Sequence, residues 1–152
     1  MKLAEALVSR ADMQKRMSQL KQRAMNSATY QEGSAPAEDP VALRADYDRM
    51  AAELASLVER INRTNLSVTI PSGQSITAAI AERDSLQLRR GFLADLASTA
   101  NSTQVRMLRT ELRMVSAVPI AEFQRDADDL ARRFRELDTS IQATNWSVDL
   151  LD

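Results

Sequence analysis

Apolar residues recur every three or four positions along four stretches of the chain, separated by segments rich in Gly, Pro, Ser and Asn. This spacing places the apolar side chains on one side of a helix, so it predicts four amphipathic helices. The second and fourth stretches alternate steps of three and four, the heptad rhythm of a helix-helix seam. The predicted helices cover about residues 2–25, 40–65, 77–101 and 119–145.

Two positions mark the ends of the second helix. Asp39 followed by Pro40 predicts its start, because the carboxylate can accept from free backbone N–H groups and proline has the backbone angle of a first helical turn. Asn65 predicts its end, since asparagine tolerates the left-handed backbone that closes many helices.

Two other segments alternate with the period of a β-strand. Leu66, Val68 and Ile70 alternate before a Pro-Ser-Gly turn, so about residues 66–76 are predicted to form a short β-hairpin. Residues 111–118 also alternate and are predicted as a strand. A helical extension stopped by the following proline is the alternative for this second segment.

The pattern T-N-x-S-V occurs twice, at Thr64 and at Thr144, in both cases at the end of a predicted helix. At the same offset of 80 residues the two helices also share identical residues, and the first helix falls on the third with Arg10 on Arg90. We infer a duplicated helical hairpin, with repeats at 1–68 and 81–148. The predicted fold is a mainly α single domain over 1–152: an antiparallel bundle or coiled coil of long helices with a small β-hairpin.

The composition disfavours most catalytic classes. The 152 residues include no cysteine and no histidine, so thiolate nucleophiles, disulfides, imidazole bases and imidazole metal ligands are absent. An enzyme would need carboxylates, Lys, Tyr or a bound metal. In the acidic stretches 82–84 and 126–129, helical spacing does not bring three carboxylates to one face, and surface ion pairs are the simpler interpretation. We therefore predict no cofactor and no metal.

Charge is nearly balanced, with a formal net charge of −1, which gives no attraction to nucleic acid. Residues 1–25 are basic and residues 119–152 are acidic. This predicts that the first helix packs beside the last helix of its own or a neighbouring chain, and an anionic surface is the alternative partner. No apolar run approaches the about 18 residues of a membrane span, and early charges argue against a signal sequence, so a bacterial cytoplasmic location is expected.

Five residues are candidates for a ligand site. Arg10 and Arg90 occupy seam positions, where a buried guanidinium needs carboxylate partners or a bound anion. Asn65, Asn145 and Trp146 lie at the predicted helix ends and could converge on a pocket. The simpler interpretation is that the asparagines stop helices and the arginines form structural ion pairs. Trp146 is the only tryptophan and either anchors the last segment in the core or marks an interface.

Three sequence stretches carry a resemblance to a known family: "RINRTN" at 60–65, "GQSITAAIAERDSL" at 73–86 and "RELDTSIQATNW" at 135–146. With these in order, nearly the whole chain resembles the septicolysin-like family of small bacterial proteins. The resemblance implies a helical cytoplasmic protein without an established reaction. Pro119 departs from the family pattern, which has an acidic residue before the last helix, and this affects where that helix begins.

The sequence predicts a structural or protein-interaction module that acts as a homo-oligomer. With only 4% aromatic residues, one chain has few large side chains to cover the seams of such long helices. A protein that binds a small, possibly anionic ligand through the seam arginines and the helix-end asparagines is the alternative.

Overall fold

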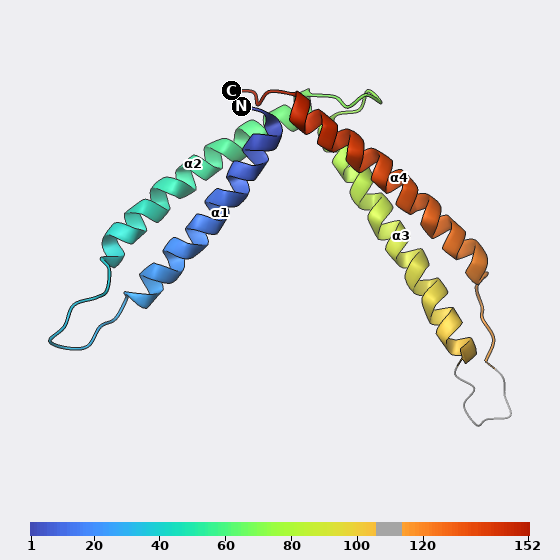
Figure 1. Cartoon of the computed structure of the whole chain (residues 1–152), viewed down its shortest axis with the longest axis horizontal. Coiled ribbons are helices and arrows are strands. Elements are labelled where there is room, and N and C mark those ends of the chain that lie inside the picture. Colours follow the sequence, from blue (N-terminus) through green and yellow to red (C-terminus); the bar gives the residue numbers. More distant parts are fainter. Residues whose placement is uncertain (106–113) are drawn as a thin grey trace. The chain divides into compact units, whose positions relative to one another are not determined.

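The computed structural model contains four α-helices and describes residues 1–105 and 114–152 (Figure 1). No sheet is formed among those residues, and the prediction of a mainly helical fold is confirmed. The helices are α1 Leu3–Asn26, α2 Pro40–Ser67, α3 Ile76–Val105 and α4 Ile120–Ser147.

The chain divides into two compact units. The first consists of Met1–Val68 together with Thr144–Asp152, and in it α1 packs along α2. The second consists of Thr69–Ala143 and contains α3 and the greater part of α4. The boundary lies within α4, so the last turn of that helix and the tail that follows belong to the first unit.

The predicted start of α2 is confirmed. Asp39 is the N-cap, its Oδ1 accepts a hydrogen bond from the backbone N–H of Val41 at 2.9 Å, and Pro40 is the first helical residue. At the start of α1, the backbone N–H of Lys2 donates to Oε2 of Glu5 at 2.7 Å. Both carboxylates lie where the helix dipole favours negative charge.

The predicted end of α2 at Asn65 was wrong. The helix continues to Ser67, and the N–H of Val68 still donates to the carbonyl of Thr64 at 2.9 Å before the backbone of Val68 becomes extended. Only glycines have positive φ angles among the described residues, so Asn65 is not a left-handed stop. The second T-N-x-S-V also stays helical up to its serine, since the backbone N–H of Val148 donates to the carbonyl of Thr144 at 3.0 Å. The pattern is thus the last turn of a helix in both places.

The predicted β-hairpin at 66–76 was also wrong, because α2 takes its first two residues and too few remain before α3 for two strands. Thr69 and Ser75 form an isolated antiparallel bridge. Inside it, Ile70 donates to the carbonyl of Gln74 at 2.9 Å, around a tight turn in which Gly73 has a φ of 92°. An L side chain rarely adopts that angle, so the turn requires glycine.

The second predicted strand, 111–118, lies partly outside the described residues. The structure does not describe residues 106–113, and residues 114–118 form no strand.

The core of each unit is a narrow row of buried side chains between two helices, which we call the line. In the first unit the line includes Leu3, Leu20 and Ile61, and in the second it includes Ile76 and Leu86. Because each of these helices packs along one neighbour in its unit, most positions of the three-four stripe are only partly covered. Among the 24 residues of α1, only Leu3, Ala4, Ala6 and Leu20 are buried.

Candidate functional site

The tail after α4 lies along the start of α1. The backbone N–H of Leu3 donates to the carbonyl of Val148 at 3.0 Å, and the N–H of Leu150 donates to the carbonyl of Met1 at 2.9 Å. Lys2 adds an ion pair with Asp149 at 3.1 Å. These bonds join the two ends of the described chain within the first unit.

The same tail is held by the last turns of α2. The buried Oγ1 of Thr64 accepts from the N–H of Leu151 at 3.0 Å. Arg60 binds both the carbonyl of Leu151, at 3.1 Å, and the carboxylate of Asp152, at 2.8 Å. Arg63 also contacts the carbonyl of Asp152. One end of the first unit is therefore assembled from the start of α1, the ends of α2 and α4, and the tail.

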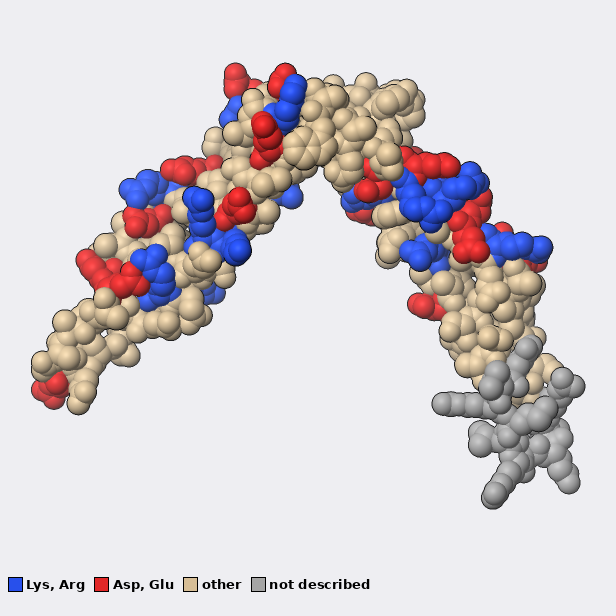
Figure 2. All heavy atoms as spheres, in the orientation of Figure 1, with Lys and Arg blue, Asp and Glu red and all other residues tan. Residues whose placement is uncertain are grey.

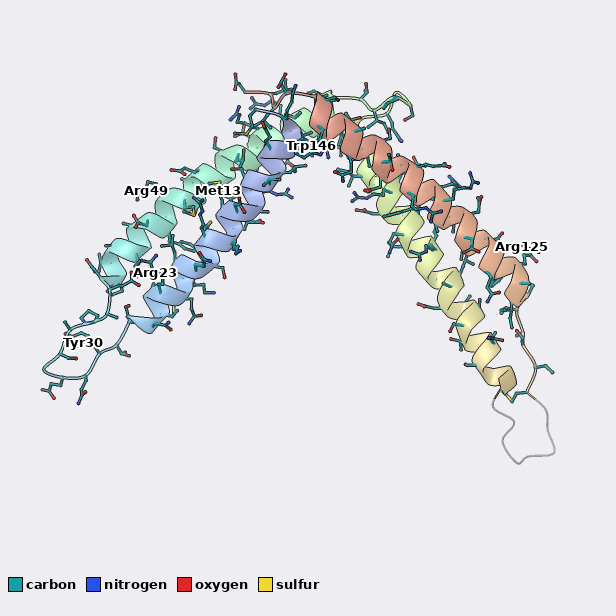
Figure 3. All side chains as sticks on the ribbon, viewed as in Figure 1. Met13, Arg23, Tyr30, Arg49, Arg125 and Trp146 are labelled. Atoms are coloured by element: carbon teal, nitrogen blue, oxygen red, sulfur yellow. The ribbon has the colours of Figure 1, made fainter. Side chains whose placement is uncertain are left out.

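Four large apolar side chains are exposed at this end of the unit: Met1, Leu66, Trp146 and Leu151. We call them the terminal patch. Trp146, which Figure 3 marks on α4, has 60% of its surface exposed, so the open alternative between core and surface is decided in favour of surface. Ion pairs of Lys2 with Asp149 and of Arg60 with Asp152 lie at the same end. We call these charged side chains the rim; protein interfaces commonly combine apolar side chains with polar and charged ones.

Asn145, next to Trp146, is buried, with 4% of its surface exposed. Its Oδ1 has no hydrogen-bond partner among the described residues. A buried acceptor without a donor costs about 1–3 kcal/mol relative to a satisfied one. Asn65, at the equivalent position of α2, is only half-buried. The two asparagines of the repeated pattern thus differ in burial.

The arginines predicted at the seams are not buried. Arg10 is half-exposed on α1 in the first unit, and Arg90 is exposed on α3 in the second unit. Neither forms an ion pair within the described part of the chain. Of the five predicted residues, Arg10, Asn65, Asn145 and Trp146 belong to the first unit, and Arg90 does not.

Equivalent backbone bonds in the two units show how α1 and α3 correspond. The bond from Leu150 to Met1 matches the bond from Ile70 to Gln74. The two donors are 80 residues apart, but the two acceptors are 73 apart. At an offset of 73, Arg10 corresponds to Arg83 and not to Arg90. The difference of seven is one heptad, which leaves the apolar stripe of a helix unchanged, so the pattern alone cannot distinguish the two alignments.

Arg83 is the charged residue that the sequence argument missed as a link between helices. Its guanidinium binds Asp138 of α4 at 3.0 Å and Asp84 at 2.9 Å, with 25% of the side chain exposed. Partial burial lowers its pKa, but hydrogen bonds and charge from the two carboxylates outweigh this, and the pKa is raised overall. The position equivalent to Asp138 in α2 is Val58, which explains why Arg10 has no such partner.

A groove lies between the two helices of each pair. One, of about 310 Å³ between α1 and α2, is lined by Arg16, Arg23 and Arg49 together with Asp46 and Glu53. Figure 3 labels two of its arginines. Glu38 pairs with Arg23 and Asp46 pairs with Arg49, while Arg16 forms no ion pair with any described residue.

The second groove, of about 270 Å³, belongs to the second unit. Its floor is apolar, formed by Ile70, Leu86 and Leu137, and Glu82 and Arg133 stand 3.9 Å apart at its edge. Charged side chains of both signs cover this part of the unit in Figure 2.

No helix in the described residues is long and apolar enough to cross a membrane. The charges that interrupt each apolar stripe account for this.

Comparison with known proteins corrects the family inferred from the sequence. No curated protein matches the chain. The crystal structure of a functionally unknown conserved protein from Corynebacterium diphtheriae is similar, with 36% sequence identity, a TM-score of 0.93 and 99% of each chain covered. Residues 10–150 match the family of unknown function DUF6847. The resemblance to the septicolysin-like family was therefore wrong, because short stretches in order are a weaker signal than a match over the length of the chain. The protein belongs to the DUF6847 family.

Proposed function

We propose that this protein is a protein-interaction module that acts as a homo-oligomer, and that a second copy of the chain covers the terminal patch. The observation that carries this proposal is Trp146, exposed on the last turn of α4 beside the unpartnered Oδ1 of Asn145. Tryptophan is among the residues that contribute most to binding when an interface buries it.

The rim charges favour a second copy as the partner. Lys2, Arg60 and Arg63 stand beside Asp149 and Asp152, so the rim carries both signs. In an isologous contact the same patch meets itself, and a rim of mixed sign can then place cations opposite carboxylates. A strongly acidic or basic partner would leave half of these groups opposed by like charge.

The thin core of each unit supports the same proposal. A stable interface buries about 1,200 Å² or more in total, and the four side chains of the terminal patch supply part of that area from each copy. The partly covered stripes of α1 and α2 can supply the remainder. Heptad packing of α2 against a helix of another copy, as in a coiled coil, is the geometry that its three-four spacing favours. A cytoplasmic location is part of the proposal, and the lack of cysteine is compatible with it.

Light scattering at several protein concentrations tests the proposal. The wild-type chain should show a molar mass of two or more times 16.9 kDa, and Trp146→Ser should move it towards the single chain. Val41→Ser removes an equally exposed apolar side chain from the other end of α2 and should leave the mass unchanged. Circular dichroism of both variants serves as the control that they remain helical. A wild-type monomer at every concentration would overturn the proposal.

Binding of a small anion is a second candidate function. It is favoured by the groove between α1 and α2, where Arg16 faces the same space as Arg23 and Arg49 and has no paired carboxylate within residues 1–105 and 114–152. A guanidinium that lacks a partner is a ready donor to phosphate or carboxylate. Inorganic phosphate should then raise the melting temperature of the wild type but not of Arg16→Gln. An equal effect of phosphate on both proteins would exclude this site.

A further inference from the structure

The outward side of α3 carries an apolar face that nothing in the described structure covers. Leu88 and Phe92 lie one helical turn apart and are 76% and 64% exposed. Residues four apart lie on the same side of a helix, so these two side chains form one continuous surface. Gly91 lies in the same turn.

No contact or backbone angle among the described residues requires glycine at position 91. A Cβ built at this position meets no atom within 4 Å, and its φ is not positive, so neither space nor backbone geometry requires glycine there. Glycine is the poorest helix former apart from proline. Glycine in such a position is suited to a backbone that comes close from outside the chain.

The distribution of apolar residues around α3 points the same way. Leu86 and Ala97 are buried within the unit, while Leu88 and Phe92 are exposed on the other side. Adjoining exposed apolar side chains often mark an interaction site. Beyond Asp95 the helix carries no charged residue as far as Val105. In Figure 2 the charged side chains of the second unit are accordingly concentrated away from the part next to the grey atoms.

We propose that a second copy of this chain docks its own α3 on this face, with the backbones closest at Gly91. The charges that flank the face favour a copy over an unrelated partner. Arg89 and Asp95 are exposed and form no ion pair within the described chain. In a contact of α3 with α3 the cation of one copy can meet the carboxylate of the other on both sides of the twofold axis.

The area available is sufficient for such a contact. A fully buried aromatic side chain contributes about 150–250 Å², and 64% of Phe92 is still exposed, so the two copies of Phe92 supply roughly a sixth to a quarter of a 1,200 Å² interface. The 30 residues of α3 extend about 45 Å and can supply the rest along its length. This surface lies in the second unit and does not include the terminal patch. The inference therefore goes beyond the proposed function and can hold or fail independently of it.

Disulfide trapping tests the contact directly, because the chain has no cysteine of its own. Leu88→Cys and Phe92→Cys are prepared separately and oxidised alone and as an equal mixture. Two cysteines cross-link only when their Cα atoms come within about 7 Å, so a covalent dimer in at least one of the three samples is expected. Val41→Cys, equally exposed but on α2, should remain uncross-linked. Cross-linking no greater than this control in all three samples would overturn the proposal.

Gly91→Leu separates docking from folding. Leucine is a strong helix former and has open space at this position, so the melting temperature of the dissociated chain should not fall. The added side chain should block the approach of a second helix and raise the dissociation constant for α3 pairing at least tenfold. The Trp146→Ser background isolates this contact from one through the terminal patch. An unchanged dissociation constant in Gly91→Leu would count against the close approach at Gly91 and therefore against the proposal.

Discussion

Thr64 and Leu151 are joined by a hydrogen bond of 3.0 Å, from the backbone N–H of Leu151 to the hydroxyl oxygen of Thr64. The same hydroxyl donates to the carbonyl of Arg60 at 2.8 Å, one turn earlier in α2. Thr64 has no exposed surface, so water does not reach its hydroxyl in the folded protein. A single buried hydroxyl thus connects the last turn of α2 to the tail that follows α4.

Thr64→Val should destabilise the protein by about 1–2 kcal/mol, because the N–H of Leu151 loses its acceptor in a buried site. The change conserves shape, so little of the effect should come from packing. Urea unfolding followed by circular dichroism measures it. Thr64→Ser keeps the hydroxyl and should cost less than Thr64→Val; the opposite order would mean that the methyl group, and not the hydrogen bond, matters here.

Asp138→Asn should weaken the link between α3 and α4. The guanidinium of Arg83 would keep Asp84 but lose the charge of its partner on α4. Since both side chains of the pair are partly exposed, the expected loss is only on the order of 0.5–1 kcal/mol. Arg10→Met is the matched control, because Arg10 forms no ion pair in the part of the chain that the structure describes, and it should be neutral or slightly stabilising. Thermal unfolding of both variants provides the comparison.

Alanine substitutions at two glycines should have opposite effects. Gly73→Ala places a side chain at a φ of 92° and should destabilise the turn before α3 by about 1 kcal/mol. Gly91→Ala fills open space in a helix interior and should stabilise the dissociated chain by up to about 1 kcal/mol. Melting temperatures measured at a concentration where the protein is monomeric test both. A loss of stability in Gly91→Ala would reveal a contact within the chain at that position.

The pair of Arg23 and Glu38 should make stability depend on acid. The hydrogen bond that Glu38 accepts from Arg23 lowers the pKa of Glu38 in the folded protein. A lowered carboxyl pKa contributes stability at neutral pH that is lost as the pH falls through the folded value. The melting temperature of wild type should therefore exceed that of Glu38→Gln slightly at pH 7, and the two should converge below pH about 4. A constant difference across this range would show that the ion pair is not responsible.

The sequence by itself determined the four helices. Three-four spacing of apolar residues is a local property, and so is the cap that Asp39 and Pro40 provide, so both are predictable from a few neighbouring residues. The absence of cysteine and histidine likewise restricts the chemistry of any site without reference to the fold.

Only the tertiary structure decided how far α2 extends and which arginine forms the link between helices. Leu66 alternates with Val68 as a strand residue would, but the last helical turn includes it and ends only at Ser67. The alignments at 73 and 80 differ by one heptad, so the helical pattern fits both. The bond between Met1 and Leu150, far apart in the sequence, distinguishes them and places Arg83 where Arg10 stands in the first unit.

The candidate site depended on the tertiary structure for the same reason. The repeated T-N-x-S-V drew attention to Asn145 and Trp146, but burial is a property of the surroundings and not of the pattern. The structure buries the amide, with no partner for its oxygen among the described residues, and exposes the indole of the next residue. Local spacing thus determined the helices, and contacts between distant segments determined which of their residues face solvent.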